Sequence, residues 1–387
     1  MKQKLFTFFL ALVASVSAIY AQSGTCGKNL TWNLNAETGV LTISGTGAMD
    51  NYYYGPVGNK VSPWNDFTSV IKTVIINDGV TSIGEWAFYE CSSLETIRFN
   101  SSIPPIMGYE DEGLFSSYIP EFYVPCSTKE VYLTALNKNN IVEESRVKEI
   151  IASGISGTNL SWKLSCDSIL TISGSGAMEQ YSWSAYRDAI KTVVINEGVT
   201  TIGEWAFRDC SSLTSVTINS DAILNKDYSS ADNLKNIFGS QVTEYIIGPT
   251  VIGIGKYAFK NCPLKTISLP ETILLIDDYA FIYCRQLESI RIPEGIKEIA
   301  QYCFSNCVNL SRVELPETIR IIHQSAFATC WNLKHIAFPK RLCEIGKMAF
   351  FCCYQLQEIT LPRYMVQVDD CAFAFCKKLT RFTIPGV

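Results

Sequence analysis

Apolar residues recur along this chain with a fixed period. Phenylalanines stand 22 or 23 residues apart, at Phe259, Phe281, Phe304, Phe327, Phe350 and Phe373. A cysteine follows each one three residues later, and then come a leucine, two apolar residues at alternate positions and a proline. One such repeat cannot bury its own apolar face, but stacked repeats bury it against each other. The period therefore predicts a solenoid.

Within a repeat, the apolar spacing predicts a short strand. In the copy after Phe304, Leu310, Val313 and Leu315 point to one side, and Pro316 ends the strand because it has no N–H to donate to a ladder. Isolated copies follow Phe88 and Phe207, and a degenerate copy follows Phe238. We therefore expect a β-rich parallel solenoid with repeats of about 23 residues, whose strand spacing resembles that of leucine-rich repeats.

A second pattern occurs twice and predicts a β-hairpin before each set of repeats. Trp32-x-Leu34 leads to Leu41-Thr-Ile43-Ser-Gly45, and Trp162-x-Leu164 leads to a matching Leu170-Thr-Ile172-Ser-Gly174. The Gly-rich strings that follow lack the Lys-Ser/Thr of a phosphate loop, so we interpret them as turns. The expected organisation is a short module over 25–148 and a second module over 155–387, with its hairpin in 155–189 and its repeat array in 190–387.

The repeat string A-F-x-x-C-x-x-L-x-x-I-x-L-P-x-x-I-x-x-I, over 71–99 and 190–387, resembles the BspA-like (Treponema-type) leucine-rich-repeat family of bacterial surface and secreted proteins. Modules of that family often end in an αβ cap, which Pro104-Pro105, Phe115, Tyr123-Val124-Pro125 and Val131-Tyr132 match. The final Ile384-Pro385-Gly386-Val387 lacks such a cap. Truncation, a partner at that end and local fraying all remain open there.

Residues 1–21 have the features of a signal peptide. Lys2 and Lys4 precede an apolar run from Leu5 to Val16, and Ala18 or Ala21 offers a small residue for cleavage. The run falls short of the roughly 20 residues that span a bilayer. We expect an exported protein without a transmembrane span, which is secreted, periplasmic or associated with the cell surface.

Composition excludes several kinds of chemistry. Hydrophobic residues make up 47% and charged residues 18%, which is typical of a folded chain. The net charge is −5 and basic residues do not cluster, so nucleic acid is not an expected partner. With only His323 and His335, a three-histidine metal site is impossible, and neither lies in a known nucleophile motif. We expect no cofactor, no metal and no catalysis.

Fifteen cysteines need an explanation. Eight occupy the same repeat position and are interpreted as a ladder of buried thiols, because stacked parallel side chains do not readily reach disulfide geometry. They are Cys91, Cys210, Cys262, Cys284, Cys307, Cys330, Cys353 and Cys376. Seven lie off this ladder, and an exported protein could oxidise a pair among them, which the sequence does not identify. They are Cys26, Cys126, Cys166, Cys303, Cys343, Cys352 and Cys371.

Two surfaces are candidates for binding. The first is the strand face, formed by the outward side chains of the predicted strands, which vary between repeats while the core does not. Its charged members include Arg98, Glu288, Arg291, Arg312, Glu314, Lys334, His335, Glu358 and Arg381. The second is an aromatic patch that could stack on sugars or anchor a protein, or instead cover the open end of the first coil. Its members are Tyr52, Tyr53, Tyr54, Trp64, Tyr181, Trp183 and Tyr186.

Three functions remain open. The family resemblance implies adhesion or recognition of an extracellular protein or glycan, which is an argument by analogy. A structural role would use the uncapped C-terminal end for self-association. An unrecognised hydrolase would need a cleft with shifted carboxylates, which the repeat does not predict.

Overall fold

The computed structural model describes residues 21–53, 60–108, 119–136, 142–179, 181–203 and 206–384. The predicted signal peptide up to residue 20, Tyr54, Phe115 and the last three residues lie outside the described residues. The chain divides into two compact units, Met1–Ala152 and Ser153–Val387. The boundary falls within strand β10 (Val147–Gly157).

Unit 1 begins with a hairpin and continues as parallel coils. Strands β1, β2 and β3 pair antiparallel, and β3, β5, β7, β9 and β10 then pair parallel. The bounds are β1 Ala21–Gly27, β2 Leu30–Asn35, β3 Val40–Gly45, β5 Thr73–Ile76, β7 Thr96–Phe99 and β9 Glu121–Pro125. A second column contains β4 Gly47–Ala48, β6 Val80–Ile83 and β8 Ile106–Met107. The short 3-10 helices are η1 Asn65–Phe67 and η2 Glu144–Arg146.

The predicted cap of unit 1 is present in the described residues. Strand β9 carries Tyr123 and Val124, both buried, and helix α2 (Lys129–Leu136) follows it. The Glu149 carboxylate accepts the backbone N–H groups of Thr128 and Lys129, at the start of the helix, where such groups have no partner within the helix. Tyr132 of α2 is fully buried, and its hydroxyl donates to the carbonyl of Ser101. The segment therefore has the αβ character that the family resemblance implies.

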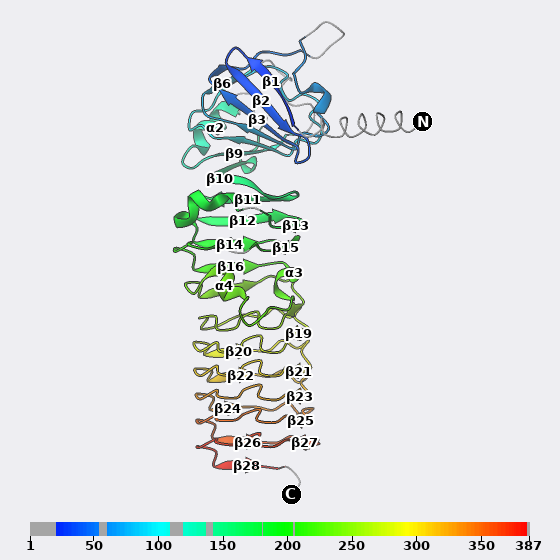
Figure 1. Ribbon diagram of the computed structural model, residues 1–387, viewed down its shortest axis with the longest axis vertical. Helices are drawn as coiled ribbons and strands as arrows, with labels where there is room; N and C mark the ends of the chain where they lie inside the picture. The colour runs from blue at the N-terminus through cyan, green and yellow to red at the C-terminus, as the bar shows by residue number, and fades with distance from the viewer. Residues whose placement is uncertain are drawn as a thin grey trace, which may run out of the picture. The chain divides into compact units, whose positions relative to one another are not determined.

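Unit 2 repeats the hairpin and then stacks parallel coils in two columns (Figure 1). The antiparallel pair is β11 (Leu160–Ser165) and β12 (Ile169–Gly174). The first column continues with β14 Thr192–Ile195, β16 Ser215–Ile218, β17 Glu244–Ile247, β20 Ser289–Arg291, β22 Arg312–Glu314, β24 His335–Ile336, β26 Glu358–Thr360 and β28 Arg381–Thr383. The second contains β13 Gly176–Ala177, β15 Val199–Thr201, β18 Gly253–Ile254, β19 Leu275–Ile276, β21 Glu298–Ile299, β23 Ile321–Ile322, β25 Glu344–Ile345 and β27 Gln367–Val368. The 3-10 helix η3 (Ser182–Ala189) follows the hairpin.

The coil that the sequence marks as degenerate carries two short helices. They are α3 (Asp221–Leu224) and α4 (Leu234–Phe238). Ser220 and Asn233 cap them through their side-chain oxygens. Phe238 and Tyr245 of this coil are nevertheless buried, so it keeps the repeat's core positions.

The repeat's phenylalanines form a continuous stack in the core. Phe281, Phe304 and Phe327 are fully buried, and successive ring centroids lie 5.3 and 5.4 Å apart with interplanar angles of 10° and 7°. Each coil thus places its ring on the rings of its neighbours, and none of these coils could bury that surface alone. The predicted parallel solenoid is confirmed.

The repeat's cysteines form a ladder of thiols, of which seven are buried and Cys376 is half-buried. Cys307 donates its thiol hydrogen to the carbonyl of Phe281 at 3.2 Å, and Cys330 donates to Phe304 at the same distance. Burial raises the pKa of these thiols well above its usual value, so they stay protonated and pack as small apolar groups. Of the cysteines off the ladder, Cys26 and Cys303 are also buried, whereas Cys126 and Cys166 are disulfide-bonded.

Candidate binding surface

The strand face of unit 2 consists of exposed side chains held in register by the parallel strands. Arg312 on β22 lies between Ser289 on β20 and His335 on β24, and Glu358 on β26 lies beside Arg381 on β28. The residues between these outward positions, such as Val313 and Ile336, point into the core. The alternation of a strand thus fixes which side chains a ligand could reach.

Several charges on this face are already paired. Arg312 contacts Glu314 at 2.6 Å, and Arg381 contacts Glu358 at 2.8 Å. His335 Nδ1 lies 3.7 Å from the other oxygen of the Glu358 carboxylate. These pairs are exposed, so each contributes little to folding stability. Their effect is to leave most of the face with balanced charge.

Arg291 has a different partner, which lies outside the strands. It forms an ion pair and a hydrogen bond with Glu271, whose carboxylate also accepts the backbone N–H of Glu294 at 3.1 Å. The hydrogen bond from Arg291 lowers the pKa of the Glu271 carboxyl. Such a carboxylate stays ionised, which does not suit the general acid that a hydrolase would need.

The strand face is hollowed where its sheet is interrupted. Strand β24 ends the sheet formed with β20 and β22, and β26 pairs with β28 in a separate sheet. Residues of both sheets line a hollow of about 600 Å³, which we call the β24–β26 hollow. Its lining residues are His335, Ile336, Ala337, Phe338, Lys340, Glu358, Thr360, Leu361, Pro362, Arg363 and Tyr364. The volume lies in the range of sites that take small ligands.

A smaller hollow of about 260 Å³ lies beside β20. We call it the β20 hollow, and it is lined by Thr266, Ile267, Ser268, Leu269, Ser289, Ile290, Arg291, Arg312 and Glu314. Both arginines here have carboxylate partners. The structure thus brings Arg291, Arg312 and Glu314 together, whereas His335 and Glu358 line the β24–β26 hollow. The candidates Glu288 and Lys334 are exposed and line neither hollow.

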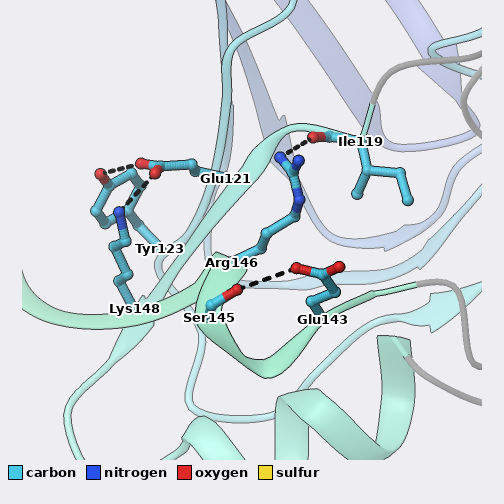
Figure 2. Close-up of polar contacts among 7 residues, drawn as sticks. All are labelled: Ile119, Glu121, Tyr123, Glu143, Ser145, Arg146 and Lys148. Carbon is cyan, nitrogen blue, oxygen red and sulfur yellow. Dashed lines mark hydrogen bonds and ion pairs between the residues drawn. The ribbon is translucent and has the colours of Figure 1, made fainter.

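In unit 1, the strand face carries a compact polar cluster (Figure 2). Arg98 on β7 is in register with Tyr123 on β9, and Tyr123 is in register with Lys148 on β10. The Glu121 carboxylate accepts the Tyr123 hydroxyl at 2.7 Å and the Lys148 ammonium at 2.5 Å. Burial, with Glu121 beside it, raises the pKa of Tyr123. Among these residues the sequence identifies only Arg98 as a surface candidate, because its repeat pattern does not extend over β9 and β10.

The buried members of the aromatic patch fit the second of its two interpretations, a cover over the open end of the first coil. Tyr52, Trp64 and Trp183 are buried, and the rings of Trp64 and Trp183 are not available to a ligand. Trp64 stacks on Phe88 at 5.8 Å and Trp183 stacks on Phe207 at 5.6 Å. Each tryptophan therefore covers the phenylalanine ring of the first coil of its unit. The preceding hairpin has no phenylalanine, so the tryptophan takes the place of a neighbouring ring in the stack.

The rest of the patch is more accessible. Tyr53 and Tyr181 are exposed, and Tyr186 is half-buried. A hollow of about 390 Å³ in unit 1 is lined by Tyr52, Tyr53, Val61, Ser62, Asn65, Trp86, Tyr89 and Glu90. Trp86 and Tyr89 meet edge to face there, with centroids 4.6 Å apart. Tyr54 lies outside the described residues.

The described residues contain no group of three or more His, Cys, Asp or Glu side chains that could hold a metal ion. No helix in the described part of the chain is long and apolar enough to cross a membrane.

Comparison with known proteins places the chain in a family. The model of the "BspA type Leucine rich repeat region" matches residues 66–172, 159–251 and 252–380. A search of the curated proteins finds no match.

Bacterial leucine-rich-repeat proteins are among the solved structures that this chain resembles. One from T. pallidum is 21% identical over 59% of this chain and 80% of its own, with a TM-score of 0.34. A leucine-rich cell surface protein from Faecalibacterium prausnitzii is 18% identical over 95% of each chain, with a TM-score of 0.27. The pneumococcal vaccine antigen PcpA is 14% identical over 94% of this chain and 88% of its own, with a TM-score of 0.33. On the family match, this chain belongs to the BspA-type leucine-rich-repeat family.

Proposed function

We propose that the protein is an exported, non-catalytic recognition module that binds an extracellular protein or glycan through its strand face. The observation that carries this proposal is the pair of hollows on that face, lined by side chains that differ from coil to coil. A solenoid with a regular core and a varied outer face is typical of extended binding surfaces. Membership of the BspA-type family supports a location at the cell surface or outside the cell.

The cysteines support export. Cys126 and Cys166 are disulfide-bonded, and disulfides persist in oxidising compartments outside the cytosol. The ladder thiols do not argue against this location, because most of them are buried and have little access to an oxidant.

The test is to present the purified protein to a combined array of matrix proteins and glycans. Saturable binding that competes in solution and weakens in at least one of the variants Arg291→Ala, Arg312→Ala and His335→Ala would support recognition by the strand face. Lys297→Ala and Arg320→Ala serve as matched controls, because both residues are exposed cations next to strands of the second column. Equal loss in the control variants, or a blank array with folded protein, would contradict the proposal.

A second candidate is assembly through the coil over residues 365–384. Phe382 and Ile384 are 47% and 50% exposed, whereas their equivalents Ile359 and Leu361 are 1% and 5% exposed. An apolar coil face of this kind could stack on a coil of another copy. Light scattering over a hundredfold range of concentration tests it, because self-association would raise the mass with concentration. A strict monomer over that range would rule it out.

A further inference from the structure

The β24–β26 hollow differs from the β20 hollow in the pairing of its cations. Lys340 and Arg363 line it, both are exposed, and neither forms an ion pair within the described part of the chain. In the β20 hollow, by contrast, Arg291 and Arg312 each contact a carboxylate. Unpaired cations make the β24–β26 hollow the more attractive of the two for an anion.

The two cations arise from a change at one repeat position. The residue after the strand-closing proline is Glu271, Glu294 and Glu317 in three successive coils, and then Lys340 and Arg363. Two of these acids hold the backbone of the next coil: Glu271 accepts the N–H of Glu294, and Glu317 accepts the N–H of Lys340 at 3.3 Å. The stack therefore passes from acidic to basic at the hollow itself.

Aromatic and hydroxyl groups complete the lining. Tyr364 is 70% exposed, Phe338 is half-buried, and Thr360 offers a hydroxyl. The one carboxylate of the lining, Glu358, is already contacted by Arg381. The hollow thus combines two cations that no described carboxylate neutralises, an exposed aromatic ring and hydrogen-bonding groups.

We infer that the β24–β26 hollow binds an acidic glycan, a sugar chain whose carboxylate or sulfate contacts Lys340 and Arg363 while a sugar ring packs on Tyr364. This inference rests on the proposed function and narrows its ligand class. Arg presents a planar fork that matches anionic oxygens, and Lys adds a point charge. A volume of about 600 Å³ suits a short saccharide segment and not a folded protein, which needs a far larger contact area.

The experiment compares sugars that differ in charge. Calorimetry with oligogalacturonate tests binding of a carboxylate, and calorimetry with dextran sulfate oligomers tests binding of a sulfate. Neutral dextran oligomers are the uncharged control for dextran sulfate. Polyglutamate provides an acidic peptide. We expect one or both acidic sugars to bind, and binding to weaken roughly tenfold in each of Lys340→Ala and Arg363→Ala.

Further variants locate the site. Tyr364→Ala should weaken binding of the acidic sugar, whereas Tyr364→Phe keeps the ring and should retain binding. Arg291 and Arg312 line the β20 hollow, so Arg291→Ala and Arg312→Ala should change the affinity for the acidic sugar less than about twofold. Variants are compared only when their circular dichroism and thermal midpoint match those of the unchanged protein.

Four outcomes would overturn the inference. They are no binding of either acidic sugar, binding of neutral dextran as tight as that of dextran sulfate, equal binding by the Lys340→Ala/Arg363→Ala double variant, and polyglutamate binding as tight as that of the sugars. If the acidic sugars fail while an array ligand still depends on Arg291 and Arg312, the inference fails and the proposed function stands.

Discussion

Trp162 donates its indole N–H to the hydroxyl of Ser182 at 2.8 Å. The equivalent tryptophan of unit 1, Trp32, is buried, and its indole nitrogen has no hydrogen-bond partner among the described residues. The sequence explains the difference, because the residue before Trp183 is Ser182, whereas the residue before Trp64 is Pro63. A duplicated motif therefore has this partly buried hydrogen bond in only one of its two described copies.

Removing the Ser182 hydroxyl should destabilise the protein. Ser182→Ala leaves the Trp162 N–H unpaired, and we expect the free energy of unfolding to fall by about 1–3 kcal/mol. Ser182→Thr keeps a hydroxyl and is the matched control. Urea unfolding followed by tryptophan fluorescence measures both, and equal stability of the two variants would show that the hydrogen bond contributes nothing.

The converse substitution should stabilise unit 1. Pro63→Ser offers Trp32 the hydroxyl that it lacks, and we expect this variant to be more stable than Pro63→Ala by about 1 kcal/mol. The comparison with alanine matters because both variants lose the rigidity of proline equally. The urea midpoints of the two variants measure the difference. A serine variant no more stable than the alanine variant would contradict the prediction.

The phenylalanine stack gives a prediction about position along the solenoid. Phe304 is fully buried between two neighbouring rings, whereas Phe373 is half-buried. Phe304→Ala should lower the free energy of unfolding by about 3–5 kcal/mol, because it leaves a cavity with rings on both sides. Phe373→Ala should lower the free energy of unfolding by clearly less. Thermal unfolding compares the two, and an equal loss would mean that the stack does not stabilise the coils as described.

The regular part of the fold can be predicted because every coil repeats the same burial. The positions of Phe304, Cys307 and Leu310 are buried in this coil and in its neighbours, so spacing alone indicates the core. The cap at β9 and α2 can be expected only from the family resemblance. The disulfide-bonded state of Cys126 and Cys166 cannot be predicted, since their positions fall outside the repeat.

Nor does the sequence predict the conformation of the coil corner. Tyr279 and Tyr283 adopt left-handed φ values of 60° and 62°, which glycine usually occupies. Their N–H groups donate to the carbonyls of Gln301 and Ser305 in the next coil. The stacking of coils stabilises this backbone, so its cause lies in contacts that no local pattern reveals.

The hollows also depend on three-dimensional pairing. Alternation along each strand is enough to name the strand-face candidates, but the interruption between β24 and β26 is a property of the folded sheets. The strand pattern misses Lys340 and Arg363, because they follow the strand-closing proline and do not lie on a strand. The signal that could find them is the change from Glu to Lys and Arg at that repeat position.

The cysteines should differ sharply in reactivity. Cys371 is exposed, whereas Cys284, Cys307, Cys330 and Cys353 are buried and free. In the native protein at pH 8, iodoacetamide should modify Cys371 first and leave these four intact until the protein unfolds, because only an accessible thiolate reacts. Peptide mass spectrometry over time measures the order. Early modification of Cys307 would contradict the buried ladder.

Two other buried thiols of the ladder predict that the stability of the fold decreases in alkali. Burial raises the pKa of Cys91 and Cys262 from 9.0 to about 12, whereas in the unfolded chain these thiols ionise near their usual pKa. Below that usual value both states hold the proton, so the stabilising contribution is fully present. As the pH rises toward 12, only the unfolded state releases the proton, which favours unfolding.

We therefore expect the urea midpoint to fall steadily between pH 8 and pH 10, with a shallower fall in a Cys262→Ala variant. Each variant is compared with its own value at pH 8, so the cavity that alanine creates does not enter the slope. Because tyrosine ionisation adds a further loss in stronger alkali, the comparison stops at pH 10. A slope unchanged by the substitution would show that the buried thiol is not the group whose ionisation destabilises the fold.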